Sequence, residues 1–437
     1  MVGAAPLITL AAVVAGASLV IVFYRTTTTK KEEDAEENDE DDEELLDLES
    51  TNLMMMAPAI SVLTFHCISS GDAAFAATEA HLRRRLTAVV ALNPWLCGRL
   101  TRRRSKMRVH VVYPRHVTSL PPACLQVTHD DQLHEGLGYA ALTARVAQLA
   151  VKDGNGCVDA RRRNEPLFRV TLVRTGPTTL ALFFSVSHVL VDGQAFYALY
   201  GMLGVDGVPA ALVVKRHHAF SRDLAALMGG TNDTLQWFTS PGAALGIVGT
   251  LVFAPPARVL VQPVSASFIA RHKAEHGNAP GFVSTNDVLT SWLLRAAGSD
   301  VGLMAMNFRG RVADLTPQHA GNYEALLGYQ RGDVCSAADI RASIAGPPFR
   351  RVHAAVPFPR SLLASARARV GLVSSWASLY VDAALPGCAQ TYHVPYFEAS
   401  QIPLRDIFIL FRPDRASLSV LALTRSLDTA TLAQLEE

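Results

Sequence analysis

Two apolar strands followed at once by a helix constrain the fold of this chain most. Residues 168–174 and 180–186 are runs of apolar and β-branched residues, and Gly176-Pro177-Thr178 between them predicts a hairpin turn. Residues 193–201 carry apolar and aromatic side chains three and four apart, which predicts a helix. The short segment between the second strand and this helix is therefore a strand–helix junction.

The junction holds the residues best suited to chemistry. It reads Ser187-His188-Val-Leu-Val-Asp192-Gly193. Junctions of this kind present side chains to clefts while rigid elements hold them. Histidine exchanges a proton near neutral pH, so His188 suits the removal of a proton from an attacking hydroxyl or amine. The alternative is a hydrogen-bonded core histidine at the end of a strand. Asp192, with Gly193 after it, can anchor an arginine and hold the turn.

Composition excludes several other kinds of site. The chain has 437 residues, which predicts two packed units, and 49% of them are hydrophobic, as expected for a globular protein with a large core. The six cysteines show neither metal nor redox spacing, so we expect reduced, buried thiols and no metal site. No zinc-finger spacing or basic-aromatic tract supports binding to nucleic acid.

The N-terminal segment predicts a membrane anchor. Residues 7–24 form an uncharged apolar run that is just long enough to cross a bilayer, for which roughly 17–25 residues are needed. Arg25, Lys30 and Lys31 follow the run and favour a cytosolic position for the rest of the chain. We expect residues 1–24 to be a single-pass anchor in the endoplasmic reticulum or another endomembrane. A cleaved signal peptide or an organelle-targeting segment is the alternative.

An acidic segment separates this run from the folded part. Residues 32–49 hold 13 of the 39 acidic groups, and like charges at this density predict a disordered spacer. The chain after this segment is correspondingly basic, which suits a phosphate-bearing partner. We expect a disordered linker at 25–56, an N-terminal half at 57–208 and a C-terminal half at 209–437.

Five sequence blocks, in the same order, resemble the BAHD acyltransferases, which belong with chloramphenicol acetyltransferases, condensation domains and carnitine acyltransferases. The junction motif is similar to the family's His-x-x-x-Asp-Gly. The other four blocks are similar to its Pro-x-x-x-Gly-Arg-Leu, Ser-Thr-x-Asp, Asn-x-Arg-x-Arg with Gly-Asn, and Thr-Ser-Trp motifs. These are Pro94-Trp-Leu-Cys-Gly98-Arg99-Leu100, Ser284-Thr285-Asn-Asp287, Asn307-Phe-Arg309-Gly-Arg311 with Gly321-Asn322, and Ser374-Ser375-Trp376.

The resemblance implies an α/β fold of two chloramphenicol acetyltransferase-like halves with a channel between them, here preceded by one transmembrane helix. Coenzyme A would enter the channel from one face and the acceptor from the other, so that they meet at His188. Acyl-CoA would then be a co-substrate rather than a bound cofactor. The acceptor would be an alcohol or an amine, water-soluble or dissolved in lipid. We expect a monomer.

The resemblance also assigns roles to residues of the junction. His188 would be the general base for direct transfer in a ternary complex. Asp192 would point away from His188 and pair with Arg309 or Arg311, which gives it a structural role. Gly193 would complete the motif at the start of the helix.

Four further residues are expected near the substrates. Ser374 and Trp376 match positions beside the tetrahedral intermediate, where a hydroxyl and an indole N–H can donate to its oxyanion. Ser284 and Thr285 match the side of the acyl donor. The alternatives are that Trp376 only fills the core and that Ser284 and Thr285 cap a helix that follows them.

One family motif is absent, which keeps other functions open. The late Asp-Phe-Gly-Trp-Gly is replaced by Asp382-Ala-Ala-Leu-Pro-Gly387. A wax-ester or diacylglycerol synthase-like enzyme is therefore an alternative. A carrier-protein-dependent condensation enzyme usually has a double histidine, whereas Ser187 precedes His188 here. A catalytically inactive, membrane-tethered binding module is the alternative from another class.

Overall fold

The computed structural model describes residues 39–68, 71–102, 108–158, 165–275, 282–398 and 403–437. The anchor expected at 1–24 and the first part of the expected linker lie outside these residues. Among the described residues, no helix combines the length and the apolar character that a membrane span needs.

The first sheet holds the predicted hairpin at its centre. Its strand order is β12-β2-β7-β6-β5, and its neighbours are antiparallel except for the parallel pair β5–β6. The predicted hairpin is formed by β6 and β7, which are almost wholly buried because their apolar side chains face helices or the core on both sides. The strands are β2 (Ile60–Ile68), β5 (Leu125–His129), β6 (Phe168–Arg174), β7 (Thr179–Val186) and β12 (Cys388–Pro395).

The second sheet is built from the C-terminal half of the chain. Its order is β10-β9-β11-β13-β14-β8, with parallel pairs on both sides of β11 and antiparallel pairs elsewhere. Its strands are β8 (Arg258–Pro263), β9 (Val301–Asn307), β10 (Glu324–Gln330), β11 (Val370–Ser375), β13 (Asp406–Phe411) and β14 (Ser419–Thr424).

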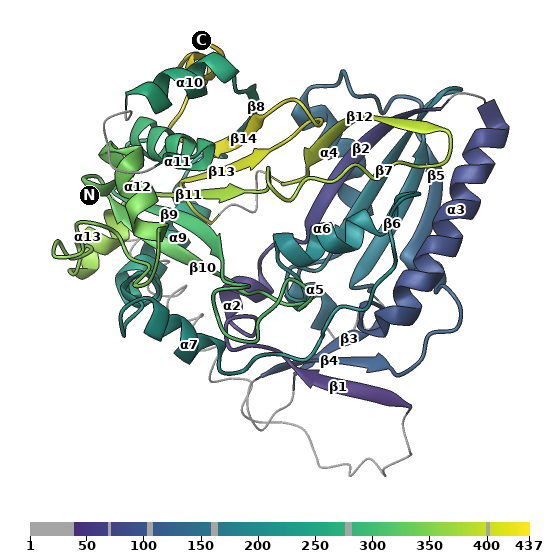
Figure 1. Ribbon diagram of the computed structural model, residues 1–437, viewed down its shortest axis with the longest axis horizontal. Helices are drawn as coiled ribbons and strands as arrows, with labels where there is room; N and C mark the ends of the chain where they lie inside the picture. Colours follow the sequence, from purple (N-terminus) through teal and green to yellow (C-terminus); the bar gives the residue numbers. More distant parts are fainter. Residues whose placement is uncertain (1–38, 69–70, 103–107, 159–164, 276–281, 399–402) are drawn as a thin grey trace, which may run out of the picture. The chain divides into compact units, whose positions relative to one another are not determined.

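Helices pack against both sheets. The long helix α3 runs along the first sheet and α11 lies against β11 of the second (Figure 1). The helices are α2 (Asn52–Met55), α3 (Gly71–Leu92), α4 (Tyr139–Val146), α5 (Gly154–Val158), α6 (Gly193–Gly201), α7 (Phe220–Leu227), α8 (Asp233–Phe238), α9 (Pro241–Phe253), α10 (Ala266–Ala274), α11 (Thr285–Ala296), α12 (Ala337–Ile344), α13 (Leu362–Arg367) and α14 (Thr429–Ala433).

One strand links the two halves. Although β12 belongs to the C-terminal half by sequence, it pairs with β2 at the edge of the first sheet. The segment from Asp382 to Gly387, which stands where the family has Asp-Phe-Gly-Trp-Gly, directly precedes β12. Asp382 accepts hydrogen bonds from Tyr380, Gln390 and Arg415, so it holds the crossing segment rather than reaching a substrate.

The expectation of a disordered linker is wrong for its last part. Glu40–Glu44 form β1, which pairs with β4 (Val109–Pro114) in a three-stranded sheet that β3 (Arg99–Arg102) completes. Basic side chains of this sheet and its neighbourhood neutralise the acidic strand, so the self-repulsion on which the prediction rested is removed. The ion pairs are Arg99–Glu40, Arg108–Glu44, Arg108–Asp47, Arg115–Asp41 and His110–Asp42.

The cysteines follow the sequence prediction only in part. All six are free thiols. Cys67 and Cys335 are exposed, however, so the expectation of burial is wrong for these two. The Sγ atoms of Cys97 and Cys124 lie 3.9 Å apart, although their spacing in sequence gave no sign of a pair. Within the described residues, no group of His, Cys, Asp and Glu side chains could hold a metal ion.

Candidate active site

The junction motif lies where it was predicted, between β7 and α6. The Nδ1 atom of His188 is 3.1 Å from the backbone oxygen of Val191. A carbonyl oxygen can only accept a hydrogen bond, so Nδ1 carries the proton. In the neutral ring, Nε2 then presents its lone pair, which is the form that a general base needs. The side chain of His188 is partly exposed, whereas the residues on both sides of it are buried.

Asp192 points away from His188 and begins α6. One of its carboxylate oxygens accepts the backbone N–H of Ala195 at 3.1 Å, which caps the helix. The other lies 2.6 Å from Arg309 Nη1 and also accepts the N–H of Tyr323. The side chains of Asp192 and Arg309 are 2% and 1% exposed. Of the two arginines that the sequence offered, Arg309 is therefore the partner.

Arg311 has a different position. Its Nη1 donates to the backbone oxygen of Asn307 at 2.8 Å, and its guanidinium lies over the ring of Phe349. It is exposed and lines a large cavity. Arg311 therefore does not support Asp192, and it adds positive charge to the cavity instead.

The cavity has a volume of about 1190 Å³ and adjoins the junction motif of residues 187–193. It is bounded mainly by elements of the C-terminal half and reaches the loop at Asp192 and Gly193. A Cβ atom added to Gly193 would lie 3.1 Å from Leu379 and 3.9 Å from Trp376 Nε1, so the glycine keeps this end of the cavity open. His188 itself is not among the residues that line this cavity.

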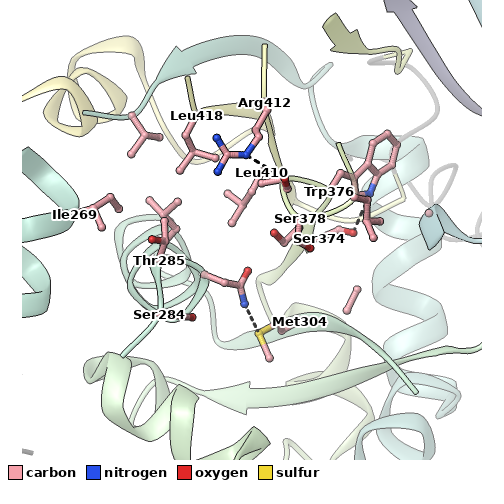
Figure 2. A pocket seen from close by; sticks show the side chains of 18 of the residues that line it. Ile269, Ser284, Thr285, Met304, Ser374, Trp376, Ser378, Leu410, Arg412 and Leu418 are labelled. Carbon is pink, nitrogen blue, oxygen red and sulfur yellow. Dashed lines mark hydrogen bonds between the residues drawn. The ribbon is translucent and has the colours of Figure 1, made fainter. Parts of the chain in front are cut away.

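Ser374 and Trp376 stand at the end of β11, where they face the cavity (Figure 2). The indole Nε1–H of Trp376 donates to Ser374 Oγ at 3.2 Å. This bond leaves the hydroxyl hydrogen of Ser374 available to a third group. Trp376 also packs against Tyr197 and Phe397. It therefore contributes to the core and lines the cavity at the same time.

Ser284 and Thr285 lie at the other side of the cavity, at the start of α11 (Figure 2). Ser284 caps this helix in a reciprocal arrangement with Asp287: each side chain accepts the backbone N–H of the other residue. The capping alternative is thus correct for Ser284, and it does not exclude contact with a ligand because both residues line the cavity.

Several cavity residues were not predicted. Lys273, Arg341 and Arg412 line it together with Arg311 and make it a basic cavity. Arg341 is partly committed, because it pairs with the buried Asp287 at 2.6 Å. These side chains come from four separate elements or loops, so no sequence pattern could have grouped them.

Glu324 is, beside Asp192, an acidic residue in the lining of this cavity. It begins β10 and lines the cavity. Burial among protein atoms, together with the nearby Asp192 carboxylate, raises the pKa of Glu324 to about 8, although Arg309 opposes the shift. The raised pKa favours the protonated carboxyl group at neutral pH, and in this form Glu324 can donate a hydrogen bond. The signal in the sequence that could have marked Glu324 as a site residue was its place two residues after the Gly321-Asn322 block.

Comparisons with known proteins agree with this architecture. No protein-family model matches the chain, and no curated protein matches it in sequence. Solved structures do match. F. sporotrichioides TRI101, crystallised with coenzyme A and T-2, has a TM-score of 0.53 at 14% identity over 90% of this chain and 96% of that chain. Vinorine synthase has a TM-score of 0.59 at 14% identity over 90% and 93%.

A third similar structure comes from a different kind of protein. The first condensation domain of the calcium-dependent antibiotic synthetase, in complex with a substrate analogue, has a TM-score of 0.56 at 12% identity over 91% of this chain and 94% of that chain. At such identities the likeness establishes the fold alone. The chain has the two-lobed α/β fold of chloramphenicol acetyltransferase-like proteins, as its motifs predicted.

Replacing Asp192 by alanine should lower stability strongly. The change removes a helix cap and leaves Arg309 as a buried, unpaired charge, which typically costs ~3–5 kcal/mol. Chemical denaturation measures the loss. Asp223→Ala is the control, because the ion pairs of Asp223 with His217 and Arg222 are screened by solvent and their loss should change stability little. Unchanged stability with lost activity would mean that Asp192 acts in the chemistry itself.

Replacing Glu324 by glutamine should raise the melting temperature, and more so at alkaline pH. The carboxyl group ionises near its ordinary value of 4.5 in the unfolded chain and near 8 in the folded one. As pH rises between these values, only the unfolded state loses the proton, so the wild type loses stability while glutamine does not. The advantage of Glu324→Gln should grow from about pH 5 to about pH 8. A constant difference would show that the pKa is not raised.

Proposed function

We propose that the chain is a coenzyme A-dependent acyltransferase that uses His188 as its general base. The observation that carries the proposal is the contact of His188 Nδ1 with the backbone oxygen of Val191, because an Nδ1–H held there leaves the lone pair of a neutral ring on Nε2. The His188 loop adjoins a basic cavity large enough for a thioester co-substrate.

The proposed step is direct transfer in a ternary complex. Nε2 of His188 takes the proton of the acceptor's hydroxyl or amine as its oxygen or nitrogen attacks the thioester carbon. The tetrahedral intermediate collapses as the carbon–sulfur bond breaks, and the imidazolium returns the proton to the departing thiolate. Atoms and charge therefore balance without any bound cofactor.

Ser374 is the best-placed donor to the oxyanion of this intermediate. Its oxygen already accepts the indole N–H of Trp376, so its own hydrogen is free to point elsewhere. A hydroxyl that accepts one hydrogen bond becomes a stronger donor in the next. Trp376 thus acts through Ser374, and the two residues form one short relay rather than two independent donors.

The basic residues of the cavity suit the phosphates of coenzyme A. Lys273 and Arg412 are partly exposed, and neither forms an ion pair with an acidic side chain in the described part of the chain. Arg341 keeps further donors beside its pair with Asp287 and stacks on Phe282. Arginine and lysine at the mouth of a cavity attract an anionic ligand and orient it.

We also propose that residues 7–24 anchor the enzyme, with the body in the cytosol, so that a lipid-soluble acceptor can reach it. The uncharged run with positive charge after it supports this orientation. Alkaline extraction of membranes tests the anchor: the full chain should stay in the pellet, and a chain that begins at Glu40 should not. Recovery of both proteins in the supernatant would refute the anchor.

Replacing His188 by alanine should remove acyl transfer and leave the fold intact. A general base typically contributes ~10²–10⁴ in rate. Release of free thiol from acyl-CoA in the presence of pooled alcohols and amines measures the reaction. His129→Ala is the matched control, because His129 is exposed at the end of edge strand β5. A His188→Ala protein that keeps activity within a few-fold of wild type would end this mechanism.

A further inference from the structure

A glutamate of the acidic segment is buried in the body of the protein. The side chains of Glu49 and Arg216 are each 0% exposed, with Glu49 Oε2 2.9 Å from Arg216 Nε. The same oxygen accepts the N–H of Leu46 at 2.9 Å. Oε1 accepts the backbone N–H of Asn322 at 2.8 Å and its side-chain Nδ2 at 3.1 Å. Four donors therefore converge on one carboxylate.

The other acidic residues that the structure describes in this segment are less buried. Glu40, Asp41 and Asp47 pair with arginines at the surface, where an ion pair contributes little. Burial of a carboxylate is costly unless its charge and its lone pairs are all satisfied. Among the acidic residues described at positions 39–49, only Glu49 is buried, and its carboxylate is fully satisfied. This difference indicates a specific task for its side chain.

Both partners of Glu49 continue to the catalytic loop. Asn322 Nδ2 donates to the backbone oxygens of His188 at 2.8 Å and Val189 at 3.3 Å. Arg216 Nη2 donates to the oxygen of Leu190 at 3.1 Å. The next carbonyl, that of Val191, accepts the Nδ1–H of His188 itself.

Each of the four consecutive backbone carbonyl oxygens from His188 to Val191 thus accepts a hydrogen bond. Two residues supply the donors for the first three, and Glu49 orients both of them. A change at Glu49 releases Arg216 and Asn322 together, and the loop then loses the contacts that fix the direction of the imidazole.

We propose that Glu49 is a positioning residue that sets the orientation of His188 through Asn322 and Arg216. The proposal rests on the proposed function, because it takes His188 to be the base. The segment that contains Glu49 is accordingly part of the catalytic unit and not a passive tether.

Removal of this support should affect turnover more than binding of the acyl donor. Small misplacements of a catalytic group can lower rates by about 10²-fold. None of Glu49, Arg216 and Asn322 lines the cavity that is assigned to the donor. We therefore expect kcat to fall by at least about tenfold while KM for acyl-CoA stays within about twofold.

The test uses the full chain with Glu49→Gln. Glutamine keeps the size of the side chain but replaces one carboxylate oxygen by an NH₂ group. This group cannot accept the two hydrogen bonds that the replaced oxygen accepts. Asp47→Asn is the matched control: it removes the same charge two residues away, from a side chain that is 63% exposed and pairs with Arg108. The control should keep wild-type kcat and KM. Melting curves establish the folded fraction, and kcat is expressed per folded molecule.

Two further variants cover the case in which Glu49→Gln does not fold. Glu49→Gln with Arg216→Gln removes the buried charge that would otherwise lack a partner, and Asn322→Ala cuts the link to His188 and Val189 without leaving any charge. Folded protein of either kind should show the same loss of kcat at unchanged KM. Wild-type kcat in any folded member of this set would overturn the proposal, as would a parallel rise in KM that accounts for the whole loss.

The controls separate this proposal from the proposed function. If the wild type releases no thiol from acyl-CoA, or if His188→Ala is as active as wild type, the proposed function has failed. If the wild type is active and His188→Ala is not, while folded Glu49→Gln matches the wild type, only the positioning role has failed.

Discussion

The buried ion pair of Asp192 and Arg309 is the interaction on which the rest of the arrangement depends. Asp192 follows β7 of the first sheet and begins α6, whereas Arg309 follows β9 of the second sheet. A buried charge without its partner is strongly destabilising, so the pair fixes how the two sheets meet. Arg309 also donates to the backbone oxygens of His319 and Gly321, which places Asn322 against the loop that carries His188. The proposed base thus comes from one half of the chain and the cavity proposed for the acyl donor mainly from the other, so the proposed reaction needs both halves docked.

The sequence was informative where a role depends on neighbours along the chain. The strand before His188 and the helix after it could be predicted because apolar spacing differs between strands and helices. Ser284 could be predicted as a cap because its partner Asp287 is three residues away. The fold and the choice between Arg309 and Arg311 needed more than spacing: the ordered family motifs supplied the fold, and only the structure showed which arginine is paired.

Other parts of the site depend on contacts between distant residues, and no local pattern marks these. Glu49 lies in a segment whose charge density predicts disorder, yet its partners Arg216 and Asn322 are far along the chain and compensate its charge. The strand β1 became ordered for the same reason, because its arginine partners come from β3 and the vicinity of β4. Glu324 looks like an ordinary strand residue until the fold places it near Asp192 in the lining of the cavity. Local pattern thus located the His188–Gly193 motif, while the tertiary structure revealed the contacts that hold it.

The most direct test of this account is the tautomer of His188 in the full chain, measured by nitrogen NMR at a pH where the ring is neutral. The structure predicts that Nδ1 carries the proton, because it donates to the oxygen of Val191, and that Nε2 is unprotonated and free to accept a proton from the acceptor. A neutral ring with its proton on Nε2 would contradict the account, because the nitrogen assigned as the base would then have no lone pair to offer.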